Sequence, residues 1–303
     1  MPELPEVESI RKQLENYVVG HTIEDVEINY KKCFTGDPEK VKGGKIKKIR
    51  RFGKALSIDL DNNYSLFIHI KMTGQLIYRG PNLKNPPDIS DKVKGGLNGK
   101  HNHVTFILDN HSSHPSSLKL RRTGKAREGQ GAALYYIDYR KFGWIKIVTS
   151  DKIQETSFVN KLGPEPFKDL TLDKFSTVVQ STGMAIKNVL MDQSKIAGVG
   201  NIYANDALFL ADIHPEKRSN KLNDAEVKKL FESIEKVLMK GLKYGGASEV
   251  SFVRPDGTTG NYQSHTLVYG KEGEKCPNGC GGEIKKIKVG GRGTYFCSEC
   301  QKK

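Results

Sequence analysis

The sequence has no long apolar run. No stretch of its 303 residues approaches the roughly 20 consecutive apolar residues of a membrane-spanning helix. No apolar signal segment follows the N-terminus either. Before position 276 there is only one cysteine, Cys33, so a scaffold of many disulfides is also excluded. We therefore expect an intracellular protein rather than a membrane or secreted one, in the cytoplasm or nucleoid of a bacterium or in the nucleus of a eukaryote.

Acidic residues are the minority among the charged ones. The chain has 49 Lys plus Arg against 35 Asp plus Glu, a formal net charge of +14. This excess favours a polyanionic partner, although many basic proteins are merely soluble. No basic amphipathic helix suited to an anionic membrane is evident. Nucleic acid is therefore favoured, and no membrane partner is expected.

The other four cysteines form two close pairs near the C-terminus. Cys276 and Cys280 are followed after sixteen residues by Cys297 and Cys300. Paired cysteines at such spacing are typical of a tetrahedral zinc site, and the segment between them reads as a β-hairpin with glycine at its tip. Disulfides are the alternative, but they are unexpected in an intracellular chain. We predict one structural Zn²⁺ that folds this segment.

Hydrophobic periodicity divides the chain into three parts. A helix is predicted over residues 5–18, followed by alternating strand patterns to about residue 148. Residues 79–101 and 110–132 are rich in Gly, Ser, Asn and Lys and are expected to be long mobile loops. After a hinge at 162–166 the period becomes helical. Strands are expected at 56–60, 68–72, 135–137 and 143–148, and helices near 175–179, 186–190, 201–210 and 223–238.

The first residues carry candidate chemistry. If Met1 is removed, Pro2 becomes an N-terminal secondary amine, partly unprotonated at neutral pH. Such an amine can attack a masked aldehyde carbon, such as C1′ of deoxyribose, form a Schiff base and expel the attached group. Glu3 lies beside it and could act as a general acid. Alternatively, Pro2 and Pro5 merely shape the entry to the helix.

Three other patterns have plainer interpretations. The glycines of residues 198–201 resemble part of a dinucleotide-binding motif, but a tight turn between helices with amides free for phosphate fits better. Arg140 and Phe142 project the same way from an extended segment, where they could plug a gap in a base stack or simply pack. Four histidines lie in the Gly- and Ser-rich region without carboxylates, and we expect them to be solvated rather than metal ligands: His101, His103, His111 and His114.

Several segments, in order along the chain, resemble one family. They are residues 1–8 (MPELPEVE), 51–54 (RFGK), 69–74 (HIKMTG), 138–143 (DYRKFG), 198–204 (GVGNIYA) and 291–301. Together they are similar to the signatures of formamidopyrimidine-DNA glycosylase, and the resemblance covers the chain apart from its two loops. The related endonuclease VIII group typically has Gly at the fourth position, where this chain has Leu4.

The resemblance implies a fold and a set of roles. The fold would be α+β: an N-terminal β-sandwich with a leading helix (1–161), a helix-two-turn-helix domain (162–265) and a zinc-finger β-hairpin (266–303). Pro2 would be the nucleophile and Glu3 the acid that protonates the sugar-ring oxygen, assisted by Glu6. Lys54, Asn201 and Arg292 would bind phosphates around the damaged nucleotide, and His69 would also contact DNA. The space left by the extruded nucleotide would be filled by Met72, Arg140 and Phe142.

The implied function is a glycosylase and AP lyase for oxidised purines such as 8-oxoguanine and formamidopyrimidines, with cleavage by β,δ-elimination. The partner would be duplex DNA with oxidised bases or abasic sites, bound by a monomer. An alternative enzyme would prefer oxidised pyrimidines, as endonuclease VIII does. A third possibility, a non-catalytic DNA-binding protein, has no use for a free N-terminal proline. The chain departs from the family in its C-x3-C pair, which must bulge around residues 278–279, and at 248–264, where the lesion-covering loop matches only loosely.

Overall fold

The computed structural model describes residues 1–109 and 131–302. The chain divides into two compact units, which are described separately. The first comprises Met1–Pro2, Glu6–Val159 and Gly245–Asn261, and the second comprises Glu3–Pro5, Asn160–Tyr244 and Tyr262–Lys303. We call residues 245–261 the return segment, because the chain comes back there to the first unit.

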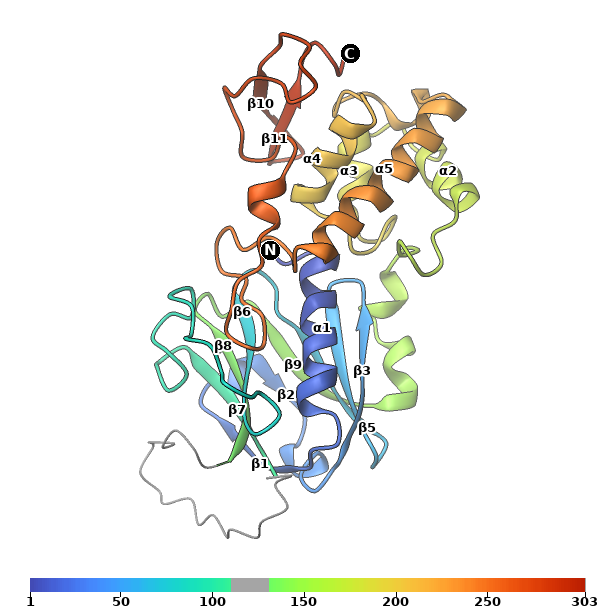
Figure 1. The fold of residues 1–303 in the computed structure, drawn as a ribbon. Helices are drawn as coiled ribbons and strands as arrows, with labels where there is room; N and C mark the ends of the chain where they lie inside the picture. Colours follow the sequence, from blue (N-terminus) through green and yellow to red (C-terminus); the bar gives the residue numbers. More distant parts are fainter. Residues whose placement is uncertain (110–130, 303) are drawn as a thin grey trace. The chain divides into compact units, whose positions relative to one another are not determined.

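The first unit contains one long helix and nine strands within the described residues (Figure 1). The predicted N-terminal helix is confirmed as α1 (Leu4–Val18). The strands are β1 (Ile23–Ile28), β2 (Phe34–Thr35), β3 (Ile46–Phe52), β4 (Ala55–Leu60), β5 (Tyr64–His69), β6 (Gly74–Arg79), β7 (Asn102–Leu108), β8 (Ala132–Asp138) and β9 (Trp144–Thr149).

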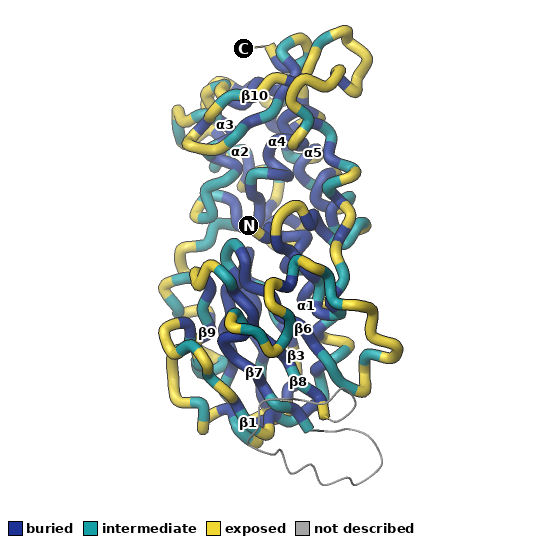
Figure 2. Tube along the Cα trace, turned by 90° about the vertical axis from the view of Figure 1, so that its left-hand side faces the viewer, coloured by how far each residue is buried: buried dark blue, intermediate teal, exposed yellow. Residues whose placement is uncertain are grey.

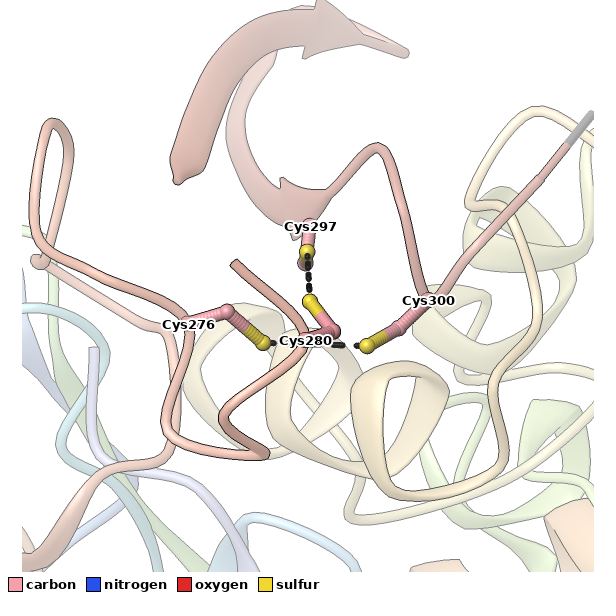
Figure 3. Close-up of side chains that lie close together, drawn as sticks. All are labelled: Cys276, Cys280, Cys297 and Cys300. Carbon is pink, nitrogen blue, oxygen red and sulfur yellow. Dashed lines mark hydrogen bonds between the residues drawn. The ribbon is translucent and has the colours of Figure 1, made fainter. Parts of the chain in front are cut away.

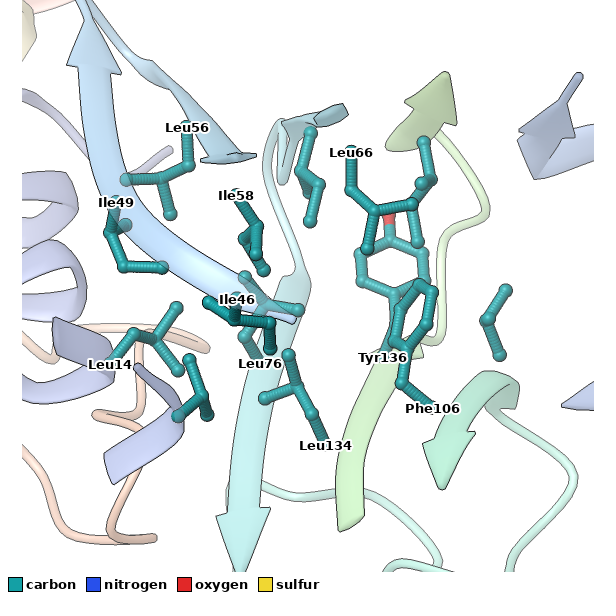
Figure 4. Packing of buried hydrophobic residues seen from close by; sticks show 14 of the residues in the cluster. Leu14, Ile46, Ile49, Leu56, Ile58, Leu66, Leu76, Phe106, Leu134 and Tyr136 are labelled. Atoms are coloured by element: carbon teal, nitrogen blue, oxygen red, sulfur yellow. The ribbon is translucent and has the colours of Figure 1, made fainter. Parts of the chain in front are cut away.

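These strands form two sheets that share a core. One sheet has the order β2-β9-β5-β4-β3 and the other β1-β7-β8-β6, and all pairings are antiparallel except β2 with β9. Figure 4 shows side chains of both sheets and of α1 pointing toward one another, among them Leu14, Ile58 and Tyr136. Alternating apolar positions of the strands thus face inward from both layers, which is a β-sandwich.

One predicted strand is wrong. The apolar alternation at Ile68, Ile70 and Met72 suggested a strand over 68–72, but β5 ends at His69 and a tight turn follows. Lys71 has a φ of +50°, and Gly74 donates its N–H to the carbonyl of Ile70 at 2.8 Å. A Cβ on Gly74 would lie 2.5 Å from that oxygen, so glycine permits the turn. Met72 therefore lies at a loop tip.

The histidine prediction is wrong for His103. This residue lies on β7, is 2% exposed, and its Nε2 is 2.7 Å from the carbonyl oxygen of Asp138. His101 is partly buried, and His111 and His114 lie outside the described residues, as does most of the expected loop 110–132. The loop 79–101 has no regular structure, as expected, but it packs on the sheet through buried Val93 rather than extending freely.

The second unit is a helical bundle with a hairpin. Its helices are α2 (Leu172–Gln180), α3 (Ile186–Met191), α4 (Asn201–Leu210) and α5 (Asp224–Lys243), and its strands are β10 (Ile284–Val289) and β11 (Arg292–Cys297). The predicted start of α5 is confirmed, because Asn223 and Glu226 form a reciprocal capping box. Almost all of α4 is buried (Figure 2), so this helix forms the centre of the unit.

Short 3₁₀ helices complete the described residues: Lys31–Cys33, Pro38–Lys40, Ser150–Glu155, Val159–Lys161, Ser219–Lys221 and Tyr262–His265. The last of these starts the linker to the hairpin, which is fixed to α4 by buried Asp206. The Asp206 carboxylate accepts hydrogen bonds from the Tyr262 hydroxyl and from the amides of Leu267, Val268 and Tyr269, at 2.8 to 3.2 Å. Among the described residues, no helix is long and apolar enough to cross a membrane.

Candidate active site and DNA-binding residues

Glu3 is fixed at the N-terminus of α4. Its side chain is 3% exposed, and Oε1 accepts a hydrogen bond from the amide of Ile202 at 2.9 Å. The N-terminal turn of a helix has amides without a partner inside the helix, and one of them holds the Glu3 carboxyl group in place. A Cβ on Gly200 would lie 2.3 Å from the carboxyl carbon of Glu3. The glycine motif at 198–201 therefore makes room for an acid rather than for a nucleotide.

The same turn anchors the start of α1. Leu4 donates its N–H to the carbonyl of Gly198 at 2.9 Å, and Gly198 has a φ of +93°. A side chain at Gly198 would also collide with Leu4. Pro2 lies directly before these residues and is buried, whereas Met1 is 51% exposed. The expected tight turn between two helices is confirmed, but its Ile202 amide is bonded to Glu3 rather than free for a phosphate.

Glu6 and Lys54 are buried charged groups of the first unit. Glu6 is 1% exposed and accepts a hydrogen bond from the amide of Ala247, in the return segment, at 2.7 Å. Lys54 is 4% exposed and occupies the two-residue turn between β3 and β4. The neighbouring Arg51 donates to Glu8 at 2.9 Å and to the carbonyl of Gly53 at 3.1 Å, which stabilises this turn. None of the three basic residues at 50, 51 and 54 is fully exposed.

His69 is held as a neutral ring. Its Nδ1 accepts the amide hydrogen of Lys71 at 2.9 Å, which leaves Nε2 to carry the proton. Burial, with smaller effects of Lys71 and Lys54, lowers the pKa of His69 to about 3. The ring packs edge-on against Phe158 and tilted against Trp144, with centroid distances of 5.2 and 5.7 Å. His69 is therefore a fixed donor that stays uncharged at neutral pH.

Met72, Arg140 and Phe142 lie together, as the wedge prediction requires. The guanidinium of Arg140 is 4.8 Å from the ring centroid of Phe142, and one of its nitrogens is 3.4 Å from the Met72 sulfur. Phe142 is 53% exposed, an unusual position for a large apolar side chain. Two turns that are distant in the sequence thus present one thioether, one cation and one ring side by side.

Buried Asp138 holds the turn that carries two of these groups. Its carboxylate accepts hydrogen bonds from the Thr73 hydroxyl, from the amide of Arg140 at 3.2 Å and from that of Gly143 at 2.8 Å. A Cβ on Gly143 would lie 1.9 Å from the hydroxyl of Tyr136. The conformation of residues 138–143 (DYRKFG) is therefore set by Asp138 and Gly143 at its two ends.

In the second unit, α3 and α4 support the hairpin turn that carries Arg292. Asn201 donates from Nδ2 to the carbonyl of Gly293 at 3.1 Å. Lys187, on α3, is fully buried and donates from Nζ to the same carbonyl at 3.0 Å and to the Thr294 hydroxyl at 2.6 Å. Arg292 itself is exposed at the start of β11. The predicted residues Asn201 and Arg292 are thus brought together on one surface.

Lys187 was missed by the sequence reasoning. Burial lowers the pKa of Lys187 to about 7, with a smaller lowering from Arg292 and an opposing effect of Glu3. A buried lysine with such a pKa beneath the turn that carries Arg292 is a functional candidate. The only signal in the sequence was a single lysine inside the short apolar segment 185–191, which is also compatible with a surface position.

The four C-terminal cysteines converge, as predicted (Figure 3). Their sulfurs all lie within 4.8 Å of one another, with 3.7 Å between Cys276 and Cys300 and 3.5 Å between Cys280 and Cys297. Tetrahedral zinc thiolate bonds of about 2.3 Å require sulfurs about 3.8 Å apart, so the set fits one Zn²⁺. The extra residue of the C-x3-C pair is accommodated by Gly279, whose φ is +67°.

Comparisons with known proteins agree along the whole chain. Family models match residues 1–145 (formamidopyrimidine-DNA glycosylase N-terminal domain), 162–252 (formamidopyrimidine-DNA glycosylase H2TH domain) and 273–303 (zinc finger found in FPG and IleRS). Formamidopyrimidine-DNA glycosylases of Listeria innocua and Lactococcus lactis are 35% and 37% identical, with 100% of each chain covered.

Solved structures give the same result. A crystal structure of a Lactococcus lactis FPG variant with Fapy-dG-containing DNA has a TM-score of 0.81 at 35% identity, with 100% of both chains covered. A complex of the Lactococcus lactis protein with abasic-site DNA has a TM-score of 0.81 at 34% identity, covering 99% of this chain and 100% of that one. The chain belongs to the formamidopyrimidine-DNA glycosylase family.

Proposed function

We propose that this protein excises oxidised purines from duplex DNA and cleaves the resulting abasic site, with the amine of Pro2 as its nucleophile. The family membership supports a DNA glycosylase and AP lyase with one structural zinc. The observation that carries the proposal is the buried acid beside Pro2. Glu3 is held by the amide of Ile202, in a place that Gly200 keeps open.

The proposed reaction begins once Met1 has been removed. The Pro2 nitrogen attacks C1′ of the damaged nucleotide, the bond from C1′ to the base breaks, and the base leaves with the proton that the Pro2 nitrogen gives up. Glu3 donates a proton to the sugar-ring oxygen as the ring opens, which leaves an iminium ion on Pro2. Elimination of the 3′ and then the 5′ phosphate follows, and water releases the sugar fragment from the enzyme.

The other site residues prepare the substrate for this chemistry. Lys54, Asn201 and Arg292 bind phosphates around the damaged nucleotide, and neutral His69 donates one more hydrogen bond. The exposed cluster of Met72, Arg140 and Phe142 enters the duplex and fills the space of the extruded nucleotide. Glu6 assists from its buried position. Extruding a nucleotide costs a few kcal/mol, which these contacts offset.

The cysteines Cys276, Cys280, Cys297 and Cys300 would hold the zinc, which supplies rigidity to the hairpin rather than reaction chemistry. The functional domains we propose are residues 1–161, 162–265 and 266–303, each of which contains one family-model match. We further propose that the protein acts as a monomer on chromosomal DNA, in the nucleoid of a bacterial cell or the nucleus of a eukaryotic one.

The test is borohydride reduction of the protein mixed with duplexes containing 8-oxoguanine, thymine glycol or an abasic site. An enzyme for oxidised purines gives covalent adducts with the first and third duplexes, and a weaker one with the second. A stronger adduct with thymine glycol would support the pyrimidine alternative, although the names of the relatives do not favour it. DNA binding without any adduct would refute the catalytic proposal.

A further inference from the structure

Residues 80–101, which we call the arm, cover the outer face of β6 and β8. Ile77 on β6 and Ile137 on β8 point away from the main core and are buried. Against them pack Val93 of the arm, which is 5% exposed, and Val253 of the return segment, which is 1% exposed. The arm, the return segment and the sheet thus share one small apolar core.

Gln75 joins the arm to the return segment. Its side chain on β6 is 1% exposed, and Nε2 donates to the carbonyl of Lys92 at 3.0 Å and to that of Ser251 at 2.7 Å. An amide group has two N–H donors. Gln75 donates one N–H to the arm and the other to the return segment, so removing this side chain would break its bonds to both.

Further hydrogen bonds align the return segment with the arm and with the edge of the sheet. Tyr78 of β6, an edge strand, donates its N–H to the carbonyl of Pro255 at 2.8 Å. In the arm, Ser90 donates its N–H to the carbonyl of Gly257 at 3.1 Å, and Lys92 donates from Nζ to that of Glu249 at 3.2 Å. The return segment is therefore held at several points between 249 and 257.

The same return segment contacts two site residues. Ser251 donates from Oγ to the carbonyl of Met72 at 2.8 Å, and the amide of Ala247 donates to Glu6 at 2.7 Å. Between these two contacts Val250 is 71% exposed. A shift at Ser251 is therefore transmitted to the Met72 turn, whereas Glu6 is held separately by Ala247.

We propose that the arm and Gln75 hold the return segment where base extrusion needs it, so that Gln75 is a positioning residue for excision. The inference rests on the proposed function, in which Met72 fills the space of the extruded nucleotide. A paired damaged base must be unstacked and unpaired, whereas an abasic site has no base to extract. A displaced Met72 turn therefore slows excision of a lesion more than cleavage at an abasic site.

The test compares two variants with the wild type. Gln75→Met keeps the volume of the side chain and removes both donors, and Val93→Ala loosens the arm without touching Gln75. Single-turnover excision from an 8-oxoguanine duplex should fall about tenfold in Gln75→Met and less in Val93→Ala. Cleavage of an abasic duplex should stay within about twofold in both. Gln180→Met is the control, because Gln180 donates to the Leu222 carbonyl in the second unit, and it should change neither rate.

Hydrogen exchange of residues 245–261 in the free protein gives a second reading. Exchange should be faster in Gln75→Met and Val93→Ala than in the wild type and the control. Equal loss of both activities, or unchanged excision despite faster exchange, would overturn the inference. If Gln75→Met fails to fold, Val93→Ala alone decides it. Failure of the wild type to excise any lesion would instead refute the proposed function.

Discussion

We predict that Asp138 stabilises the turn that carries Arg140 and Phe142 more than any other single side chain there. We expect Asp138→Asn to destabilise the first unit and to slow lesion excision several-fold. The carboxylate is 1% exposed, and one oxygen accepts from Thr73 and Arg140 while the other accepts the amide hydrogen of Gly143. An asparagine amide can replace only one of these oxygens, because its NH₂ group is a donor.

The magnitude follows from the lost hydrogen bond. In Asp138→Asn the NH₂ group faces a donor, the amide of Gly143 or the Thr73 hydroxyl. One charge-assisted hydrogen bond is lost and a buried donor is left without an acceptor, which costs about 2 to 3 kcal/mol. Excision falls because Phe142 and Arg140 are no longer held in one arrangement before DNA binds.

Urea unfolding followed by tryptophan fluorescence measures the first effect. The only tryptophan, Trp144, starts β9 in the same unit and directly follows Gly143. Asp61→Asn is the matched control, since exposed Asp61 accepts one hydrogen bond, from the amide of Lys45 at 2.9 Å. The reasoning is refuted if Asp138→Asn lowers the free energy of unfolding no more than Asp61→Asn does.

Three further predictions concern the metal and two titrating groups. Removing zinc with a chelator, or replacing one ligand in Cys300→Ser, should lower the zinc content from about one per chain and weaken DNA binding; metal-free wild type with full binding would contradict this. The pKa of His69 is depressed to about 3, so the unfolded chain binds the extra proton between pH 6.5 and 3. Over this pH range, acid should lower the free energy of unfolding of the wild type by up to ~1.4 kcal/mol per pH unit more than that of His69→Gln, as measured by urea unfolding. Parallel stability curves of the two proteins would contradict this prediction. The pKa of Lys187 is lowered to about 7, so the unfolded chain binds more protons than the folded one between pH 7 and about 10. The free energy of unfolding of the wild type should therefore rise over this range relative to that of Lys187→Met. A difference that does not change with pH would contradict the lowered pKa.

Local patterns predicted the regular elements well. α1 and α5 have apolar stripes, and the capping box marks the start of α5, so their bounds follow from short-range chemistry. The zinc hairpin also follows from spacing alone, because four thiolates have few alternatives. By contrast, the turn after β5 could not be found, since Ile70 and Met72 continue the alternation of a strand, while the φ of +50° at Lys71 and the close approach of Gly74 to Ile70 are not visible in the sequence.

Contacts between distant segments escaped the sequence reasoning. Nothing local indicates that residues 245–261 return to the first unit or that Val93 of the arm is buried against the sheet. The sequence neighbours of Lys187 and His103 do not indicate burial, and both side chains are buried only in the folded chain. Pro2 and Glu3 were identified because their chemistry depends on position in the sequence, whereas the partners of Glu3 are about 200 residues away.

The central claim is that Pro2 forms the covalent bond to DNA. The most direct measurement is mass spectrometry of the borohydride-reduced adduct with an 8-oxoguanine duplex after digestion with nuclease and trypsin. The account predicts the sugar remnant on the N-terminal peptide, residues 2–11, attached to the Pro2 nitrogen, and no adduct when an N-terminal tag blocks removal of Met1. A remnant on a lysine such as Lys54, or undiminished trapping by the tagged protein, would contradict it.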